Sequence, residues 1–401
     1  MSSRNRRNIV VVGASLAGFR AVEELRHQEY DGAITVVGAE PHLPYDRPPL
    51  SKQVLAGAWD AERLPLTPIG KDVDDLDVEW RLGVAASALD LGSDDVELAD
   101  GTRVPYDGLV IATGAAVRTL PGQPELEGLH TLRTLDDCLA LRADLDAAPE
   151  RVVVVGAGFI GAEVAATARQ RGLEVTLLEA LATPLQRALG DEMGRVCADI
   201  HREHGVDLRL STGVDGFDDD GHGRLRAIRL TDGTTVEADV AVVGVGVAPS
   251  TAWLADSGLT IDNGVVCDET CLAAPDVVAA GDIARWPNQR FGEVMRVEHW
   301  ENAQEQGAHA ARRLLGDLAP YEPVPWFWSD QYDRKIQLAG RSSADDEVQI
   351  VDGSIEERRF VALYGRAGRV VGVLGMNRPR PVMEYRQLIA DGVSWEDALA
   401  R

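Results

Sequence analysis

The sequence predicts an α/β protein that builds one parallel-sheet unit twice and then adds a smaller α+β segment. Residues 8–13 form a continuous apolar run that leads into a glycine turn, a helical segment at 18–29 and a second apolar run at 33–38. The same order returns over residues 151–179. Apolar runs of this length on either side of a helical segment are typical of a βαβ unit, so the fold class follows from the repeat.

The expected domain boundaries follow from how each half ends. Residues 108–114 and 240–246 look like buried strands that end in glycine, so the two halves close in the same manner. Prolines around residues 320–328 indicate a linker into a final hairpin-rich stretch. At about 150 residues per domain, the 401 residues allow two or three domains. We expect a first Rossmann-like domain made of two segments, residues 1–115 and 248–321, and a second one at residues 116–247. A C-terminal α+β interface domain is expected at residues 322–401.

Composition excludes several classes of partner. With 65 Asp and Glu against 40 Lys and Arg, the chain carries a charge of −25, which repels nucleic acid and anionic membrane surfaces. Its apolar runs are shorter than the ~20 residues that cross a bilayer, and its N-terminus lacks a signal-peptide pattern. The 4 cysteines are too few for a disulfide scaffold, and Cys267 and Cys271 are interpreted as reduced thiols. We therefore predict a cytoplasmic protein without a metal site.

The second glycine turn has the composition of a dinucleotide-binding site. Its residues are Gly156, Gly158, Phe159, Ile160 and Gly161. Such a turn lets backbone N–H groups and the helix dipole face a pyrophosphate, and the glycines remove side chains from its path. Glu179 ends the next strand, where its carboxylate would accept a hydrogen bond from a ribose 2′-OH and repel a 2′-phosphate. The pattern favours NAD over NADP.

The first glycine turn has a weaker signal. Its residues are Gly13, Ser15, Leu16 and Ala17, with Ser15 where a central glycine is expected, and Glu40 follows the next strand. Two such turns in one chain, each with an acidic strand end, strengthen the interpretation and imply two dinucleotides. Two nicotinamides have no evident chemistry together, whereas a nicotinamide can pass hydride to a flavin. We therefore predict FAD at the first turn and NADH at the second.

Six short segments give a resemblance to a known family. They are residues 44–52, 112–114, 243–249, 280–282, 297–307 and 325–333. Through them the chain resembles, over essentially its whole length, the bacterial FAD-dependent ferredoxin reductases that use NADH. The resemblance implies that NADH passes hydride to flavin N5 and that the flavin passes electrons to a protein partner.

The resemblance also implies roles for individual residues. Lys52 would lie near flavin N5, and Glu163 would contact the nicotinamide and pair with Lys52; a solvated helix glutamate is the alternative for Glu163. Trp300 and Trp328 would flank the isoalloxazine, or belong to the core. The other FAD contacts would come from Arg47, Val84, Ala112, Thr113, Gly114, Arg133, Gly281 and Asp282. Gly246 would contact NAD. An ordinary helix cap is the alternative for Asp282, and an inter-domain salt bridge is the alternative for Arg133.

The absence of a cysteine from residues 38–66 decides the subclass. Related disulfide reductases carry a redox-active cysteine pair beside the flavin. Without one, the resemblance implies single-electron transfer to a [2Fe–2S] ferredoxin, or a rubredoxin, that serves a cytochrome P450 or a Rieske oxygenase. Two alternatives stay open: an NADH oxidase or peroxidase, and a flavin redox sensor similar to apoptosis-inducing factors.

Docking of an acidic ferredoxin would need a local basic face. The candidates are Arg312, Arg313, Arg334, Lys335, Arg378 and Arg380, with an ordinary solvated surface as the alternative. Two other patterns are not interpreted as metal sites. His201 and His204 are expected on a solvated helix surface, and residues 218–220 in a solvated loop.

Overall fold

The computed structural model of the protein describes residues 7–67 and 72–401. The chain divides into two compact units, each made of three segments. The first unit consists of Met1–Asp46, Leu64–Ala116 and Ala248–Pro325. The second consists of Arg47–Arg63, Val117–Val247 and Trp326–Arg401. The two dinucleotide-type sheets fall in different units, and the division into three domains stays a prediction.

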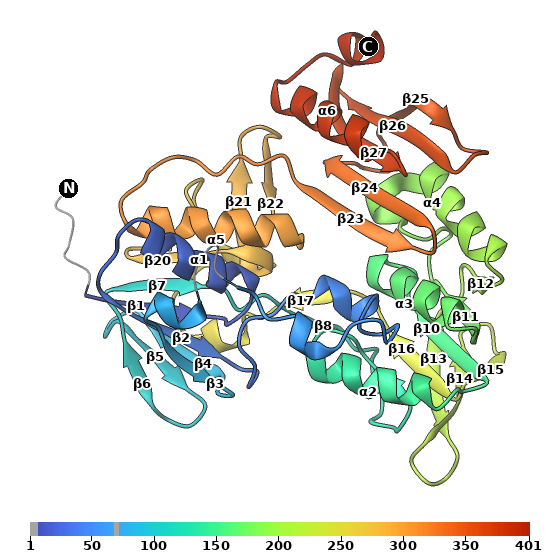
Figure 1. Ribbon diagram of the computed structural model, residues 1–401, viewed down its shortest axis with the longest axis horizontal. Helices are drawn as coiled ribbons and strands as arrows, with labels where there is room; N and C mark the ends of the chain where they lie inside the picture. Colours follow the sequence, from blue (N-terminus) through green and yellow to red (C-terminus); the bar gives the residue numbers. More distant parts are fainter. Residues whose placement is uncertain (1–6, 68–71) are drawn as a thin grey trace. The chain divides into compact units, whose positions relative to one another are not determined.

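The first unit is built on a six-stranded sheet with the order β19-β20-β7-β1-β2-β3 (Figure 1). All neighbours are parallel except β19 and β20. The strands are β1 (Asn8–Val12), β2 (Ala33–Gly38), β3 (Glu79–Leu82), β7 (Gly108–Ile111), β19 (Leu272–Ala274) and β20 (Val277–Ala279). Because Val12 pairs with both Val37 and Ile111, these strands end at one edge, where the predicted flavin residues follow.

Alternating side chains of β1 serve two cores, as expected for a strand covered on both faces. Ile9 and Val11 pack with α1 (Leu16–His27) and α5 (Trp300–Leu314), whereas Val10 and Val12 face a small antiparallel sheet. That sheet contains β4 (Ala86–Asp90), β5 (Asp95–Leu98) and β6 (Arg103–Pro105). Figure 1 shows α1 and α5 side by side, and a Cβ on Gly307 would lie 2.2 Å from the Ala17 carbonyl oxygen. Glycine therefore permits the close helix contact.

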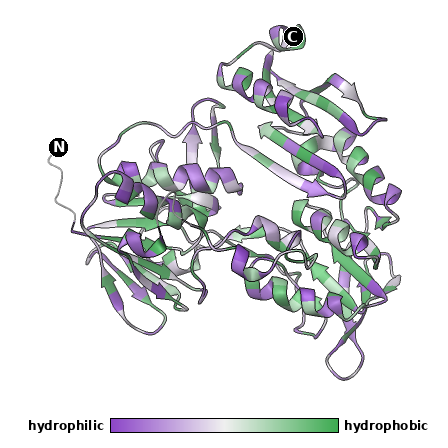
Figure 2. Cartoon of the chain, in the orientation of Figure 1, coloured by the Kyte–Doolittle hydropathy of each residue, from purple (hydrophilic) through white to green (hydrophobic). Residues whose placement is uncertain are grey.

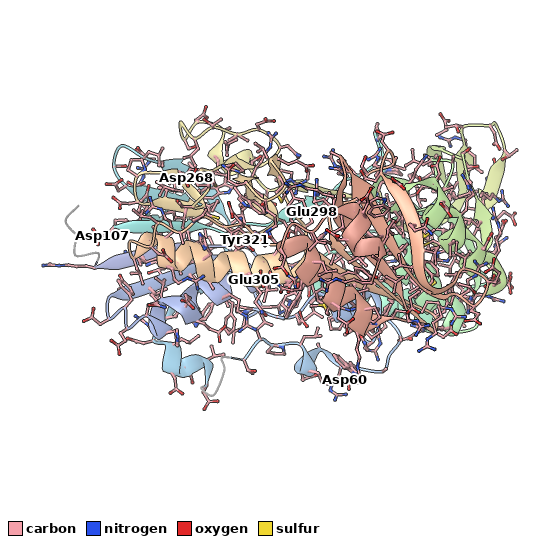
Figure 3. All side chains as sticks on the ribbon, turned by 90° about the horizontal axis from the view of Figure 1, so that it is seen from above. Asp60, Asp107, Asp268, Glu298, Glu305 and Tyr321 are labelled. Atoms are coloured by element: carbon pink, nitrogen blue, oxygen red, sulfur yellow. The ribbon has the colours of Figure 1, made fainter. Side chains whose placement is uncertain are left out.

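A second small sheet completes the first unit. It consists of β18 (Val265–Val266), β21 (Ala284–Asn288) and β22 (Glu293–Met295). Its buried Trp286 donates a hydrogen bond from Nε1 to the Tyr321 carbonyl at 3.0 Å. The Tyr321 hydroxyl donates in turn to Asn302 of α5 at 3.2 Å, and Figure 3 labels Tyr321 beside this helix.

The second unit repeats the parallel design with the order β12-β11-β10-β16-β9. The strands are β9 (Leu129–His130), β10 (Arg151–Val155), β11 (Glu174–Leu178), β12 (Asp207–Arg209) and β16 (Val240–Val243). Its helices are α2 (Leu135–Asp146), α3 (Phe159–Gln170) and α4 (Gln186–Glu203). An antiparallel sheet of β13 (Val214–Asp219), β14 (Leu225–Leu230) and β15 (Thr235–Glu237) packs on Val153 and Val155. Strands of both parallel sheets are mostly hydrophobic in Figure 2.

Several short elements lie outside the main sheets and α-helices. They are the strands β8 (Ala115–Val117) and β17 (Val247–Pro249), and the 3-10 helices η1 (Pro48–Ser51), η2 (Ala61–Arg63), η3 (Val73–Leu76), η4 (Ala252–Leu254) and η5 (Gly281–Ile283). The 3-10 helix η1 belongs to the second unit and ends at Ser51, which is followed by Lys52.

The C-terminal segment forms an antiparallel sheet with the order β23-β24-β27-β26-β25. Its elements are β23 (Trp326–Gln331), β24 (Arg334–Gly340), β25 (Glu347–Ser354), β26 (Arg359–Arg366), β27 (Arg369–Met376), α6 (Pro379–Ala390) and α7 (Trp395–Leu399). One sheet face packs on α4 through a core that includes Phe360, Tyr364 and Met193.

This packing corrects one prediction made from the sequence. His201 does not lie on a solvated helix surface, because it is 0% exposed and faces the β23–β24 turn. Its Nδ1 lies 2.9 Å from the Tyr332 hydroxyl, and the His204 ring stacks on Tyr332 with ring centroids 3.8 Å apart. Burial lowers the pKa of His201 to about 4. His201 is therefore a neutral core residue.

Within residues 7–67 and 72–401, no helix is long and apolar enough to span a membrane.

Candidate active site

The first glycine turn lies between β1 and α1 and requires glycine at position 13. Gly13 has φ +125°, and a Cβ there would lie 2.1 Å from the Ala112 carbonyl oxygen. A Cβ on Gly18 would lie 2.0 Å from the Gly13 carbonyl oxygen. The turn and the helix therefore touch backbone to backbone, as the close helix–strand packing of a dinucleotide site requires.

The residues that follow this turn start the helix. Ser15 is the N-cap of α1 in an extended conformation, and Leu16 and Ala17 form the first helical turn. Amides of a first helical turn have no intrahelical acceptor, which is the property that binds a pyrophosphate. Glu40 follows β2 at the same edge, where its Oε2 accepts a hydrogen bond from the Tyr45 hydroxyl at 2.5 Å. The arrangement fits a dinucleotide although Ser15 replaces glycine.

The loop after β7 lies at the same sheet edge. Ala112 begins the loop, and Thr113 Oγ1 donates to the Ser250 carbonyl at 3.2 Å. Gly114 has φ +66°, and its carbonyl accepts from the Ser250 amide at 3.0 Å. The Val84 amide donates to the last carbonyl of β2 at 3.1 Å, so a backbone contact of Val84 with a ligand would use its carbonyl.

Gly281 and Asp282 lie in the short helix η5 and not at the start of an α-helix. Gly281 has φ +77°, and its amide donates to Gln306 Oε1 at 2.9 Å. Gln306 is fully buried and also accepts from Asn302 at 3.2 Å. The Asp282 carbonyl accepts from Arg296 at 2.9 Å. The hydrogen bond by which the Gln306 side chain of α5 fixes the Gly281 backbone could not be predicted from the sequence.

Trp300 is the first residue of α5 and is anchored by its polar edge. Its Nε1 donates to Asp46 Oδ1 at 2.6 Å. A tryptophan held in this way presents a fixed aromatic surface. Its role beside a flavin stays a proposal.

The second glycine turn lies between β10 and α3. Gly156 has φ +97°, and a Cβ there would lie 2.5 Å from the Gly244 carbonyl oxygen. A Cβ on Gly161 would lie 2.0 Å from the Gly156 carbonyl oxygen. At Gly158, by contrast, an added Cβ would meet nothing within 4 Å. The fold itself gives no steric reason for glycine at that position, whereas a bound pyrophosphate would.

Glu179 is fixed beside this turn. Its Oε2 accepts from the Ala157 amide at 2.8 Å, and its Oε1 accepts from the Leu181 amide at 2.8 Å. The carboxylate therefore lies at the end of β11 next to the glycine turn, where the sequence predicted a ribose contact. Gly246, after β16, has φ +100° and likewise has open space where its Cβ would be.

Phe159 and Ile160 begin α3 and point to different environments. Phe159 packs edge-on against Phe327 with ring centroids 4.4 Å apart, whereas Ile160 is 47% exposed. Trp328 lies on the other face of β23 and stacks on Trp326, with ring centroids 5.4 Å apart.

Arg47 and Arg133 lie together in the second unit. Arg47 precedes η1 and donates from Nη1 to the Arg133 carbonyl at 2.6 Å. Arg133 is followed by Thr134, whose side chain caps α2 by accepting from the Asp137 amide at 3.1 Å. The helix start therefore sets the position of both arginines.

Lys52 and Glu163 form the buried ion pair that the sequence analysis expected. Lys52 Nζ lies 2.7 Å from Glu163 Oε2, and the Glu163 side chain is only 3% exposed. Glu163 is therefore not a solvated helix residue. A buried carboxylate must be paired and hydrogen-bonded, because an isolated charge in the interior is costly.

The partners that complete this pair were not predicted from the sequence. The Ser51 hydroxyl donates to Glu163 Oε2, and the Ser329 hydroxyl donates to Glu163 Oε1 at 2.8 Å. Gln331 Nε2 donates to Ser329 Oγ at 3.2 Å. Serine and glutamine are too common for their spacing to signal such a cluster. The only hint was their place inside the segments that carry the resemblance.

The cysteines offer no reactive thiolate. All four are free and buried. Burial raises the pKa of Cys138, Cys197 and Cys271 to about 12, and that of Cys267 well above its ordinary value. Only the thiolate attacks a disulfide, so these residues are unsuited to thiol exchange. In the described part of the chain, no three His, Cys, Asp or Glu side chains gather as a metal site requires.

Most of the basic docking candidates already have acidic partners. Arg312 pairs with Glu24 at 3.0 Å in the first unit. In the second unit, Lys335 pairs with Asp330 at 2.6 Å and Arg378 with Asp352 at 3.2 Å. Arg334 pairs with Asp333 at 3.1 Å, and Arg313 Nε donates to a threonine hydroxyl. Arg380 lies in the first turn of α6.

Known proteins resemble this chain over nearly its whole length. The family described as pyridine nucleotide-disulphide oxidoreductase matches residues 7–307, and the one described as reductase C-terminal matches 326–401. Rhodocoxin reductase of Rhodococcus erythropolis is 40% identical over 96% of this chain and 89% of its own length. The ferredoxin–NAD(+) reductase component of the anthranilate 1,2-dioxygenase system of Burkholderia cepacia is 39% identical over 96% and 94%. The crystal structure of the covalent putidaredoxin reductase–putidaredoxin complex matches with a TM-score of 0.92 and 35% identity, over 98% of this chain and 96% of that chain.

Proposed function

Because the chain belongs to the pyridine nucleotide-disulphide oxidoreductase family and carries the reductase C-terminal domain, we propose that it is an FAD-containing, NADH-dependent ferredoxin reductase. The observation that carries the proposal is the pair of dinucleotide turns in a chain without a reactive thiol. Gly158 leaves open space where a pyrophosphate would lie, and every cysteine is buried. Electrons that enter from NADH must therefore leave without an internal disulfide.

The residues of the chain bind and orient the reactants. The chemistry that a bound FAD would supply is acceptance of a hydride and release of electrons one at a time. The turn at Gly13 and the loop at Ala112 would hold FAD, and the turn at Gly156 would hold NADH. The Glu179 carboxylate would accept a hydrogen bond from the adenosine ribose hydroxyl and would repel a 2′-phosphate. Lys52 supplies a cation that would stabilise negative charge on the reduced ring.

The relatives support the class of partner. One relative is named rhodocoxin reductase, and another is named as the ferredoxin–NAD(+) reductase component of a dioxygenase system. One solved structure is a covalent complex of putidaredoxin reductase with putidaredoxin. We infer that this chain reduces a [2Fe–2S] ferredoxin that serves a cytochrome P450 or a Rieske oxygenase. We place it in the cytoplasm, a compartment that agrees with its four unpaired thiols.

The first test is spectroscopic. The purified protein should be yellow, and extraction should release FAD. Under anaerobic conditions, stoichiometric NADH should bleach the flavin much faster than NADPH does. A protein without flavin, or a flavin that NADH does not reduce, would contradict the proposal.

A further inference from the structure

Glu163 is held by more donors than an ion pair requires. Its carboxylate is an acceptor only, and it receives Lys52 and Ser51 on Oε2 and Ser329 on Oε1. The three donors come from two different elements, since Ser51 and Lys52 lie at η1 and Ser329 lies in β23. Both serines are at least 98% buried, so water does not replace them readily.

The direction of each serine proton is fixed by a second contact. Ser329 Oγ accepts from Gln331 Nε2 at 3.2 Å, so its single proton is directed to Glu163. Ser51 Oγ likewise lies 3.4 Å from Lys52 Nζ, which can only donate. The Ser51 carbonyl also accepts from Thr167 Oγ1 at 2.8 Å, one helical turn beyond Glu163. The η1 segment is therefore attached to α3 at two successive turns.

This arrangement determines where the Lys52 ammonium lies. The terminal torsion of a glutamate is broad, so a carboxylate that is bound at one oxygen can rotate. Lysine carries its charge on a flexible stem and does not orient itself. Donors on both carboxylate oxygens fix the carboxylate plane, and the fixed plane then directs Lys52 Nζ.

We propose that Ser51 and Ser329 are positioning residues for hydride transfer, which act by orienting Glu163 and, through it, Lys52. The proposal rests on the proposed function and extends it to two residues that do not themselves touch the reactants. It makes the step from NADH to flavin depend on a hydroxyl in the C-terminal sheet.

The experiment is stopped-flow reduction of the FAD-loaded protein by NADH, which separates the limiting rate constant from the dissociation constant of NADH. Ser329→Ala and Ser51→Ala should each lower the limiting rate constant by about 10- to 100-fold, the range for loss of one hydrogen bond to a charged group. The dissociation constant should change by less than about threefold, because Glu179 and the glycine turn are untouched. Ser342→Ala is the matched control, since it removes a serine hydroxyl that bonds the Ala188 carbonyl in the same unit.

A double variant tests whether Ser329 acts through Glu163. If it does, Glu163→Gln/Ser329→Ala should be no slower than Glu163→Gln alone, because residues in one network are not additive. Wild-type rates in both serine variants, multiplicative effects in the double variant, or an equal loss in Ser342→Ala would overturn the positioning role. A wild-type protein that NADH fails to bleach would overturn the proposed function, and the positioning role with it.

Discussion

Replacement of Gly158 by alanine separates ligand binding from folding. Gly158 is the N-cap of α3 with φ −72° and ψ −179°, a conformation that alanine adopts without strain. An added Cβ meets nothing within 4 Å. Alanine is a poorer N-cap than glycine by less than ~1 kcal/mol, and the lower entropy of its unfolded chain offsets ~0.4–1 kcal/mol. We therefore expect Gly158→Ala to leave stability nearly unchanged.

The same methyl group should weaken NADH binding. It would occupy the space through which the backbone approaches the pyrophosphate, at a cost of one hydrogen bond to a charged group, or ~1.5–3 kcal/mol. The dissociation constant of NADH should therefore rise by about 10- to 100-fold. Gly161→Ala is the contrasting variant, because its Cβ would lie 2.0 Å from a backbone oxygen. That overlap should cost ~1–3 kcal/mol of stability.

Two assays decide the result. Thermal unfolding measures stability, and stopped-flow flavin reduction at increasing NADH measures the dissociation constant. The reasoning is refuted if Gly158→Ala binds NADH as tightly as the wild type, or if it unfolds as readily as Gly161→Ala.

Three further predictions concern Glu179, His201 and the basic face. Glu179→Ala should lower the ratio of kcat/KM for NADH to that for NADPH by roughly tenfold or more, whereas Glu174→Ala at the start of β11 should not change this ratio. Because the pKa of His201 falls to about 4 when folded and is about 6.5 when unfolded, the unfolded chain binds the extra proton, so stability should decline as pH falls through this window. His201→Gln should remove up to ~3 kcal/mol of that decline. The unfolding midpoints of this variant at pH 7 and at about pH 4 should therefore differ less than those of the wild type. Reversing the charges of Arg334 and Lys335 should raise the KM for ferredoxin at low salt, and an unchanged KM would exclude this face.

The two glycine turns were predictable because their requirements are local. A positive φ at Gly13 and Gly156 and the helix contact at Gly161 arise within a few residues of sequence. The pair of Lys52 and Glu163 was predicted only through the family resemblance, since its members lie far apart in the chain. The serine hydroxyls around Glu163 depend on how η1, α3 and β23 meet, and no sequence period encodes that meeting.

His201 shows a signal that could have been read correctly. Beyond the non-helical Gly190, Met193, Cys197 and His201 recur every four residues along α4, which places His201 on the buried face. Because histidine is polar, His201 was expected at a solvent-exposed position, but the Tyr332 hydroxyl supplies a hydrogen-bond partner that allows it to be buried. The ion pairs of the basic candidates were not predictable in the same way, because Asp330 and Lys335 meet through strand pairing.

The most direct test of the central claim is NADH-driven cytochrome c reduction by the FAD-loaded protein, with and without a [2Fe–2S] ferredoxin, while oxygen is recorded. The account predicts a large rate that depends on ferredoxin and little oxygen uptake in its absence. Rapid oxygen consumption that ferredoxin does not change would contradict it and favour an NADH oxidase. Slow flavin reduction with a persistent charge-transfer band would instead favour a redox sensor.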